Sequence, residues 1–225
     1  SLVEYFSGNR TSIDFVSTQL FSMSKKPFLE NFTKTVSENF IFKILSFGIR
    51  LATGILVARL FGVEGRGTLA LVLTVSGIAA QLGNFGLHAS TVWHGTQNPK
   101  AWPKLSGGLL FFALVNGSVF GLVVVSLAAY FPDRLQLTGV LLAITALLVP
   151  ANLFRDFGNS VLLGIKSDFI YNRIEFLISF AGLLVISGLW IVGSDDLFLY
   201  LLLIFLIQIA TYFRVYRHIY EKIGI

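Results

Sequence analysis

The sequence contains no cysteine, which excludes disulfide frameworks and thiolate metal sites. Its three histidines, His88, His94 and His218, give a metal centre few ligands, so we expect neither a metal nor another cofactor. Charged residues are also scarce, at 13% of the chain against about 25% in an ordinary soluble domain. A water-exposed surface cannot be built from this composition.

Apolar residues, in contrast, make up 55% of the 225 positions, and the mean hydropathy is +0.77. They come in long blocks, and a helix of about 20 residues spans the roughly 30 Å hydrocarbon core of a bilayer. We therefore predict an all-α membrane protein with a bundle of about six transmembrane helices within 36–213, between an N-terminal cytoplasmic segment, 1–35, and a basic cytoplasmic tail, 214–225. The six blocks are residues 40–61, 68–87, 105–131, 135–154, 176–193 and 197–213.

Glycine and proline mark the ends of several blocks. The stretch GVEGRG at 62–67 predicts a tight turn between two antiparallel helices, and Pro150 predicts a kink or an end late in the fourth block. Residues 1–22 are polar and precede Met23, the single methionine, so we expect natural translation to start at Met23. The alternative is a short N-terminal extension that belongs to the protein.

The basic residues give the predicted orientation. They are spread thinly between the apolar blocks and form no dense patch with interleaved aromatics, so nucleic acid is not an expected partner. Because cytoplasmic loops are enriched in Lys and Arg, we predict a multi-pass protein of the cytoplasmic membrane with its N-terminus inside. That orientation puts eleven cations inside (Lys25, Lys26, Lys34, Lys100, Lys104, Arg155, Lys166, Arg173, Arg214, Arg217 and Lys222) and three outside (Arg59, Arg66 and Arg134).

Arg50 lies at the midpoint of the first block, where an uncompensated cation costs about 2.5–3.5 kcal/mol. Lys43 precedes it by almost two helical turns, so the two cations share one face of a helix. We predict that they form a cationic wall of a cavity for a phosphate or another anion. The alternative is that Lys43 reaches the membrane surface and Arg50 caps a neighbouring helix.

Polar residues in the later blocks are further cavity candidates. Each of them could instead bond one helix to another. Arg155 and Asp156 are adjacent, point about 100° apart on a helix and need not pair. The candidates are Gln81, Asn84, Asn116, Asn152 and Arg155, together with Asp156 and Gln208.

Carboxylates are absent from the first four blocks, and Glu175 precedes the fifth. A cationic substrate would therefore find no counter-charge, which favours an anionic ligand. An enzyme would have to use Asp195 and Asp196, but a polar turn between two helices explains this pair equally well. We predict no catalytic residues and no enzymatic activity.

Three stretches together resemble the polysaccharide flippases of the multidrug and oligosaccharidyl-lipid exporter superfamily. They are ILVARLFGVEGRGTLALV at 55–72, LGNFGLHASTVWH at 82–94 and LLGIKSDFIYNRIEFL at 162–177. The matching positions are Ala58, Arg59, Gly62, Glu64 and Gly67, then Phe85, Gly86 and Leu87, and finally Gly164, Phe169 and Asn172.

The resemblance implies that the chain moves an undecaprenyl-pyrophosphate-linked oligosaccharide across the membrane by alternating access. Family members have two six-helix lobes around a cationic cavity, a setting that would suit Lys43 and Arg50. This chain would then be one lobe, with membrane lipid and the anionic lipid-linked sugar as its ligands. The missing C-terminal lobe would come from the same or a second chain. The alternatives are a multidrug exporter of the same superfamily and a non-catalytic scaffold subunit of an envelope-assembly complex.

Overall fold

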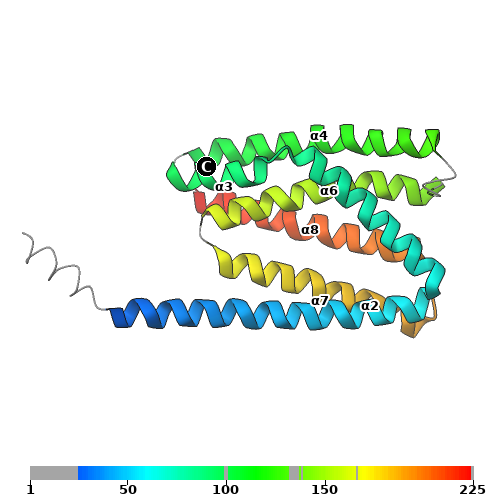
Figure 1. Cartoon of the computed structure of the whole chain (residues 1–225), viewed down its shortest axis with the longest axis horizontal. Helices are drawn as coiled ribbons and strands as arrows, with labels where there is room; N and C mark the ends of the chain where they lie inside the picture. The colour runs from blue at the N-terminus through cyan, green and yellow to red at the C-terminus, as the bar shows by residue number, and fades with distance from the viewer. Residues whose placement is uncertain (1–24, 99–100, 132–136, 138, 166, 224–225) are drawn as a thin grey trace, which may run out of the picture. The chain divides into compact units, whose positions relative to one another are not determined.

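The computed structural model describes residues 25–98, 101–131, 137, 139–165 and 167–223. Over these residues the chain is helical and contains no strand, which confirms the predicted all-α class. The chain divides into two units, residues 1–41 and residues 42–225, and the second carries all the cavities discussed below. In order, the helices are α2 (Lys25–Asn84), α3 (Leu87–Gln97), α4 (Trp102–Tyr130), α6 (Gly139–Gly164), α7 (Asp168–Val192) and α8 (Leu197–Ile223) (Figure 1).

Among the described residues, five helical segments are long and apolar enough to cross a membrane, so the chain is a multi-pass membrane protein. The first segment, Phe40–Asn84, has 45 residues, or about 68 Å at 1.5 Å per residue, more than twice the hydrocarbon core. Gly62 interrupts it with φ 67° and ψ −168°, a backbone conformation that is nearly confined to glycine. The predicted turn at 62–67 thus divides α2 into two segments of crossing length. The other four are Lys104–Tyr130, Gly139–Gly164, Phe169–Val192 and Leu197–Glu221.

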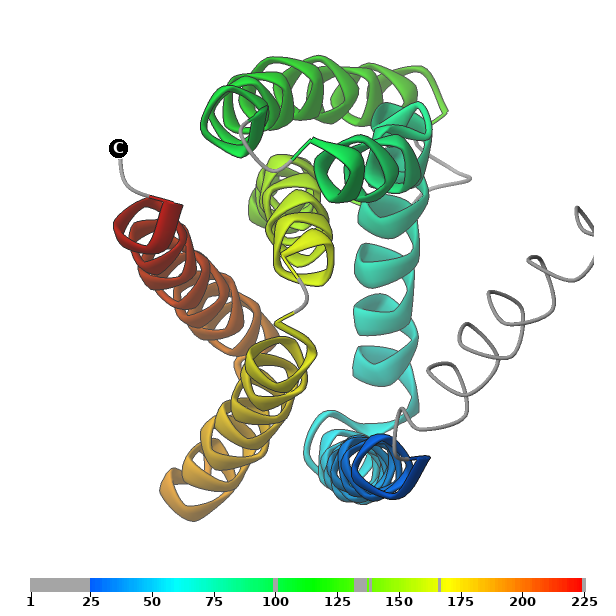
Figure 2. The same cartoon turned by 90° about the vertical axis from the view of Figure 1, so that its left-hand side faces the viewer.

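Helix α6 is the centre of the second unit and contacts α3, α4, α7 and α8 (Figure 2). Its crossing with α4 is close because Gly117 and Gly121 lie against it: a Cβ on Gly117 would come within 2.4 Å of Pro150 Cα. Pro150 is inside α6, which continues to Gly164. The prediction that the fourth span ends at residue 154 is therefore wrong.

Other helix boundaries also differ from the prediction. Helix α7 begins at Asp168 rather than at 176, and α8 continues to Ile223, so most of the expected basic tail belongs to a helix. Of the expected N-terminal segment, residues 25–35 are part of α2, and the suggested leader 1–22 lies outside the described residues.

Helix α3 was not predicted. Its eleven residues are too few to cross a membrane. The Trp102 ring fixes its position, since a Cβ added to Gly95 of α3 or to Gly164 of α6 would lie within 2.3 Å of that ring. Only glycine leaves room for the indole at these two positions, and Trp102 itself is buried. The indole therefore holds the end of α3 against the end of α6.

Candidate functional site

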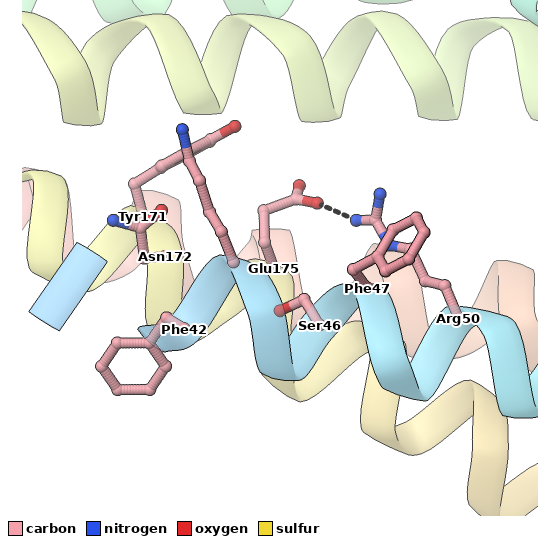
Figure 3. Close-up of a pocket in the computed structure, with 8 residues that line it drawn as sticks. Phe42, Ser46, Phe47, Arg50, Tyr171, Asn172 and Glu175 are labelled. Carbon is pink, nitrogen blue, oxygen red and sulfur yellow. Dashed lines mark hydrogen bonds and ion pairs between the residues drawn. The ribbon is translucent and has the colours of Figure 1, made fainter. Parts of the chain in front are cut away.

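A cavity of about 270 Å³ lies between the first half of α2 and the start of α7. Lys43 and Arg50 both line it, which confirms that the two cations share one face of the helix. Figure 3 shows Arg50 beside Glu175 in this cavity. The other lining residues are Phe42, Ser46, Phe47, Tyr171, Asn172 and Glu175. Two phenylalanines from α2 make part of this wall apolar, so the cavity combines positive charge with an apolar surface.

Arg50 does not stand alone in this cavity. Its Nη2 atom donates a hydrogen bond to Oε2 of Glu175 over 2.9 Å, and its Nε donates to Oγ of Ser179 over 3.2 Å. Ser179 in turn donates to the carbonyl oxygen of Glu175. Arg50 is thus paired with a carboxylate on another helix, a partner that the sequence argument did not name. Its side chain remains 61% exposed, so the guanidinium is still open to a ligand.

Glu175 also faces the interior of the bundle with its other oxygen, Oε1. Asn159 of α6 donates its Nδ2 to this oxygen over 3.4 Å, and the Tyr212 hydroxyl of α8 lies equally near to it. The Tyr212 hydroxyl is closer to Oδ1 of Asn159, at 2.9 Å. Glu175 therefore belongs to a junction of α2, α6, α7 and α8. It lies inside α7 and not at the edge of a span, contrary to expectation.

A second cavity of about 400 Å³ adjoins the first, and Tyr171 is part of both walls. Its lining includes the polar residues Gln81 and Asn84 of α2 and Asp156 of α6. Its remaining lining residues are Gly86, His88, Ala89, Asn159 and Leu163. No Lys or Arg occurs in this lining, in contrast to the first cavity.

Helix α3 brings His88 to the second cavity. The backbone N–H of His88 donates to Oδ1 of Asn84 over 3.0 Å, which ties the start of α3 to the end of α2. Its Nδ1 lies 3.1 Å from the carbonyl oxygen of Asp156 and contacts the Ser160 hydroxyl. These bonds fix the ring against α6. Two predicted residues, Gln81 and Asn84, thus meet a histidine that the sequence did not single out.

The third cavity, of about 410 Å³, lies between the second half of α2 and α6 and shares Gln81 and Asp156 with the second. Asn152 and Arg155, two of the cavity candidates from the sequence, line it as well. Arg155 Nε lies 3.4 Å from Oδ1 of Asp156, so the adjacent residues do pair, although their spacing did not require it. Because α6 extends to Gly164, this pair lies within a span and not in a cytoplasmic loop.

Asn116 does not belong to any of these three cavities. Its Nδ2 donates to the carbonyl oxygen of Gly83, so it bonds α4 to α2, the structural role that the sequence left open. Asn152 combines both roles, because its Oδ1 also lies 3.4 Å from Nε2 of Gln208 on α8. Polar residues in these helices therefore divide between cavity lining and helix packing.

Asp196 has a structural role of its own. Its Oδ1 accepts hydrogen bonds from the backbone N–H groups of Phe198 and Leu199, at 2.9 and 3.2 Å. This is the geometry of a helix N-cap, here at the start of α8. Within the described residues, no group of three or more His, Asp or Glu side chains could hold a metal ion.

Sequence reasoning missed Glu175, Asn159, His88 and Tyr171 as cavity residues, whereas it had named Asp156 as one that could line a cavity. One signal could have identified Glu175. Charged residues inside a membrane pair with one another, so a mid-span arginine calls for a carboxylate on another helix. Asn159 gave no such signal, since it follows the predicted end of the fourth span.

Comparison with known proteins does not assign the chain to a family or a function. No protein-family model, curated protein or solved structure matches the chain. The resemblance to polysaccharide flippases therefore rests on the three sequence stretches alone, and the functional argument rests on the cavities.

Proposed function

We propose that the chain is one lobe of a flippase that moves an anionic, lipid-linked oligosaccharide across the cytoplasmic membrane for surface polysaccharide biosynthesis, by alternating access. The observation that carries the proposal is the position of Lys43. It lines the first cavity beside Arg50 and forms no hydrogen bond or ion pair with the residues that the structure describes. An unpaired ammonium group is a suitable contact for a diphosphate.

The charges around the three cavities favour an anion. Arg50 is paired with Glu175 and Arg155 with Asp156, which leaves Lys43 as the excess positive charge. Arg50 can add to the attraction, because most of its side chain is exposed. A diphosphate between Lys43 and Arg50 would receive charge-assisted hydrogen bonds, which are about twice as strong as neutral ones.

An apolar surface beside this cavity suits the lipid end of such a molecule. Phe47 is 70% exposed, and Ile44 and Leu51 beside it are about half exposed, so the first half of α2 presents an apolar surface next to the two cations. A polyprenyl chain would lie along this surface while its diphosphate enters the cavity. The cavity and the surface beside it would thereby take the two parts of an amphiphilic substrate.

The proposed orientation places the site for loading from the inner leaflet. Lys43 lies in the N-terminal half of the first span, and other cavity residues lie at the end of α2, the start of α3, the later part of α6 and the start of α7. These elements share one end of the second unit in Figure 1. With the N-terminus in the cytoplasm, that end is the cytoplasmic one.

A multidrug exporter is the second candidate, and one observation favours it. Asp156 and Glu175 are carboxylates within membrane-spanning helices, and an organic cation would use them as counter-charges. The sequence argument against this candidate was the lack of such carboxylates. Both carboxylates are already paired with arginines, which is why the anionic substrate remains the preferred proposal.

The test is equilibrium binding to the purified chain in lipid nanodiscs. We expect a polyprenyl diphosphate that carries a saccharide to bind, and Lys43→Gln to weaken binding about tenfold or more, the effect of losing one charge-assisted hydrogen bond. Lys104→Gln is the matched control, because Lys104 is exposed and lies outside the first cavity. Equal affinity of the Lys43→Gln variant, together with binding of tetraphenylphosphonium that Glu175→Gln abolishes, would favour the exporter instead.

A further inference from the structure

We infer that the second cavity binds the hydroxyl groups of the saccharide, so that phosphate and sugar occupy separate, adjoining parts of one site. The inference rests on the proposed function and assigns a ligand to a cavity that the phosphate argument does not use. The side chains that would bind these hydroxyl groups are Gln81, Asn84, His88 and Asp156, which line the cavity from α2, α3 and α6.

Each of these four side chains keeps a polar atom with no partner among the described residues. Asn84 uses Oδ1 for the backbone of His88, which leaves its Nδ2. His88 uses Nδ1, which leaves Nε2, and Asp156 pairs through Oδ1, which leaves Oδ2. The Gln81 amide has both atoms left. None of these atoms is fully buried, since no buried side-chain N or O in the described part lacks a partner.

The mixture of donors and acceptors selects the class of ligand. A sugar hydroxyl donates one hydrogen bond and accepts others, so it needs both kinds of partner close together. Amide groups supply both, the Asp156 carboxylate accepts, and the histidine ring adds a nitrogen. A phosphate would be repelled by Asp156 in a lining without Lys or Arg, and a lipid tail would leave these polar groups unsatisfied.

Tyr171 links the two binding regions. It lines both cavities, with the cations on one side and the polar groups on the other. A saccharide joined directly to a diphosphate would therefore pass this ring, whose apolar face suits the C–H face of a pyranose. Cavities of about 270 and 400 Å³ are near the lower end of the roughly 300–1,000 Å³ range of ligand pockets.

The test compares three lipids on the purified chain in nanodiscs: polyprenyl diphosphate, the same diphosphate carrying a disaccharide, and a polyprenyl glucoside without phosphate. We expect the disaccharide to increase affinity over the bare diphosphate in the unaltered chain. Gln81→Leu should reduce that increase about three- to tenfold, the effect of one hydrogen bond, and leave binding of the bare diphosphate unchanged. Gln97→Leu, at an exposed glutamine outside all the described cavities, is the matched control and should change neither.

The results that would overturn the inference differ from those that would overturn the proposed function. The inference fails if the disaccharide adds no affinity, if Gln81→Leu weakens both diphosphates equally, or if Gln97→Leu has the same effect. The proposed function fails if Lys43→Gln leaves binding of both diphosphates unchanged. In that case the polyprenyl glucoside still tests the inference, because its binding must fall with Gln81→Leu.

Discussion

Arg50 on α2 and Glu175 on α7 are 125 positions apart in the sequence, and their side chains meet at 2.9 Å. The pair changes the meaning of a mid-span arginine. A charge that would be costly in lipid is compensated by the protein, so Arg50 alone is no longer an argument for an anionic ligand. The argument for an anionic ligand now depends on Lys43, which lines the same cavity and has no such partner among the described residues.

The energy of this ion pair can be measured by a double-mutant cycle. We expect Arg50→Ala and Glu175→Ala each to lower the free energy of unfolding, with a coupling energy of about 1 kcal/mol, since the arginine is largely exposed and Glu175 is not. Unfolding in mixed micelles gives the four values. The exposed pair Arg217 and Glu221 is the control, with an expected coupling of about 0.3–0.5 kcal/mol. A coupling at Arg50 no larger than at this control would contradict the prediction.

The crossing of α4 and α6 should not tolerate a side chain at Gly117. The added Cβ of Gly117→Ala would lie 2.4 Å from Pro150 Cα, and backbone cannot easily move aside. We expect the free energy of unfolding to fall by about 1–3 kcal/mol. Gly108→Ala on the same helix is the control, because its Cβ meets nothing within 4 Å. If both variants unfold alike, the two helices do not cross at Gly117.

The break in α2 should depend on Gly62. Its φ of 67° with ψ of −168° strains any other residue, and we expect Gly62→Ala to cost about 1–3 kcal/mol of unfolding free energy. Gly67→Ala is the control, since Gly67 has no positive φ and no atom near its Cβ position. Equal stability of the two variants would show that a regular helix can replace the break.

The absence of cysteine allows the topology to be mapped with single introduced thiols and a membrane-impermeant reagent. If α2 crosses twice, Val63→Cys and Ser194→Cys should react from the same side of the membrane, and Gln97→Cys from the opposite side. Val63 is 93% exposed at the break, so its thiol should be accessible. An unreactive thiol at 63 would mean that this position lies within lipid and that α2 crosses once.

The sequence predicted the helical class and the main apolar spans because hydropathy depends on composition alone. It also located the break in α2, since GVEGRG combines a glycine at the turn with charged neighbours. The prediction of a shared face for Lys43 and Arg50 held because helical periodicity fixes it.

Contacts between helices could not be predicted from hydropathy or helical periodicity. The segment around Asp156 and Asn159 is polar, which suggested the end of a membrane span. It nevertheless lies within α6, because its polar side chains point into cavities and toward α7. The end of α6 at Gly164 and the position of α3 both depend on the Trp102 ring, a contact over long sequence distances. Such contacts leave no local pattern.

The separation of Arg50 and Glu175 has a consequence for biosynthesis. At about 5–20 residues per second, the ribosome needs roughly 6–25 s to add the 125 positions between them. Throughout that interval the first span exists with an arginine whose carboxylate has not yet been made. Its final place beside α7 is therefore reached only after most of the chain has been synthesised, and the order of membrane insertion differs from the order of bundle assembly.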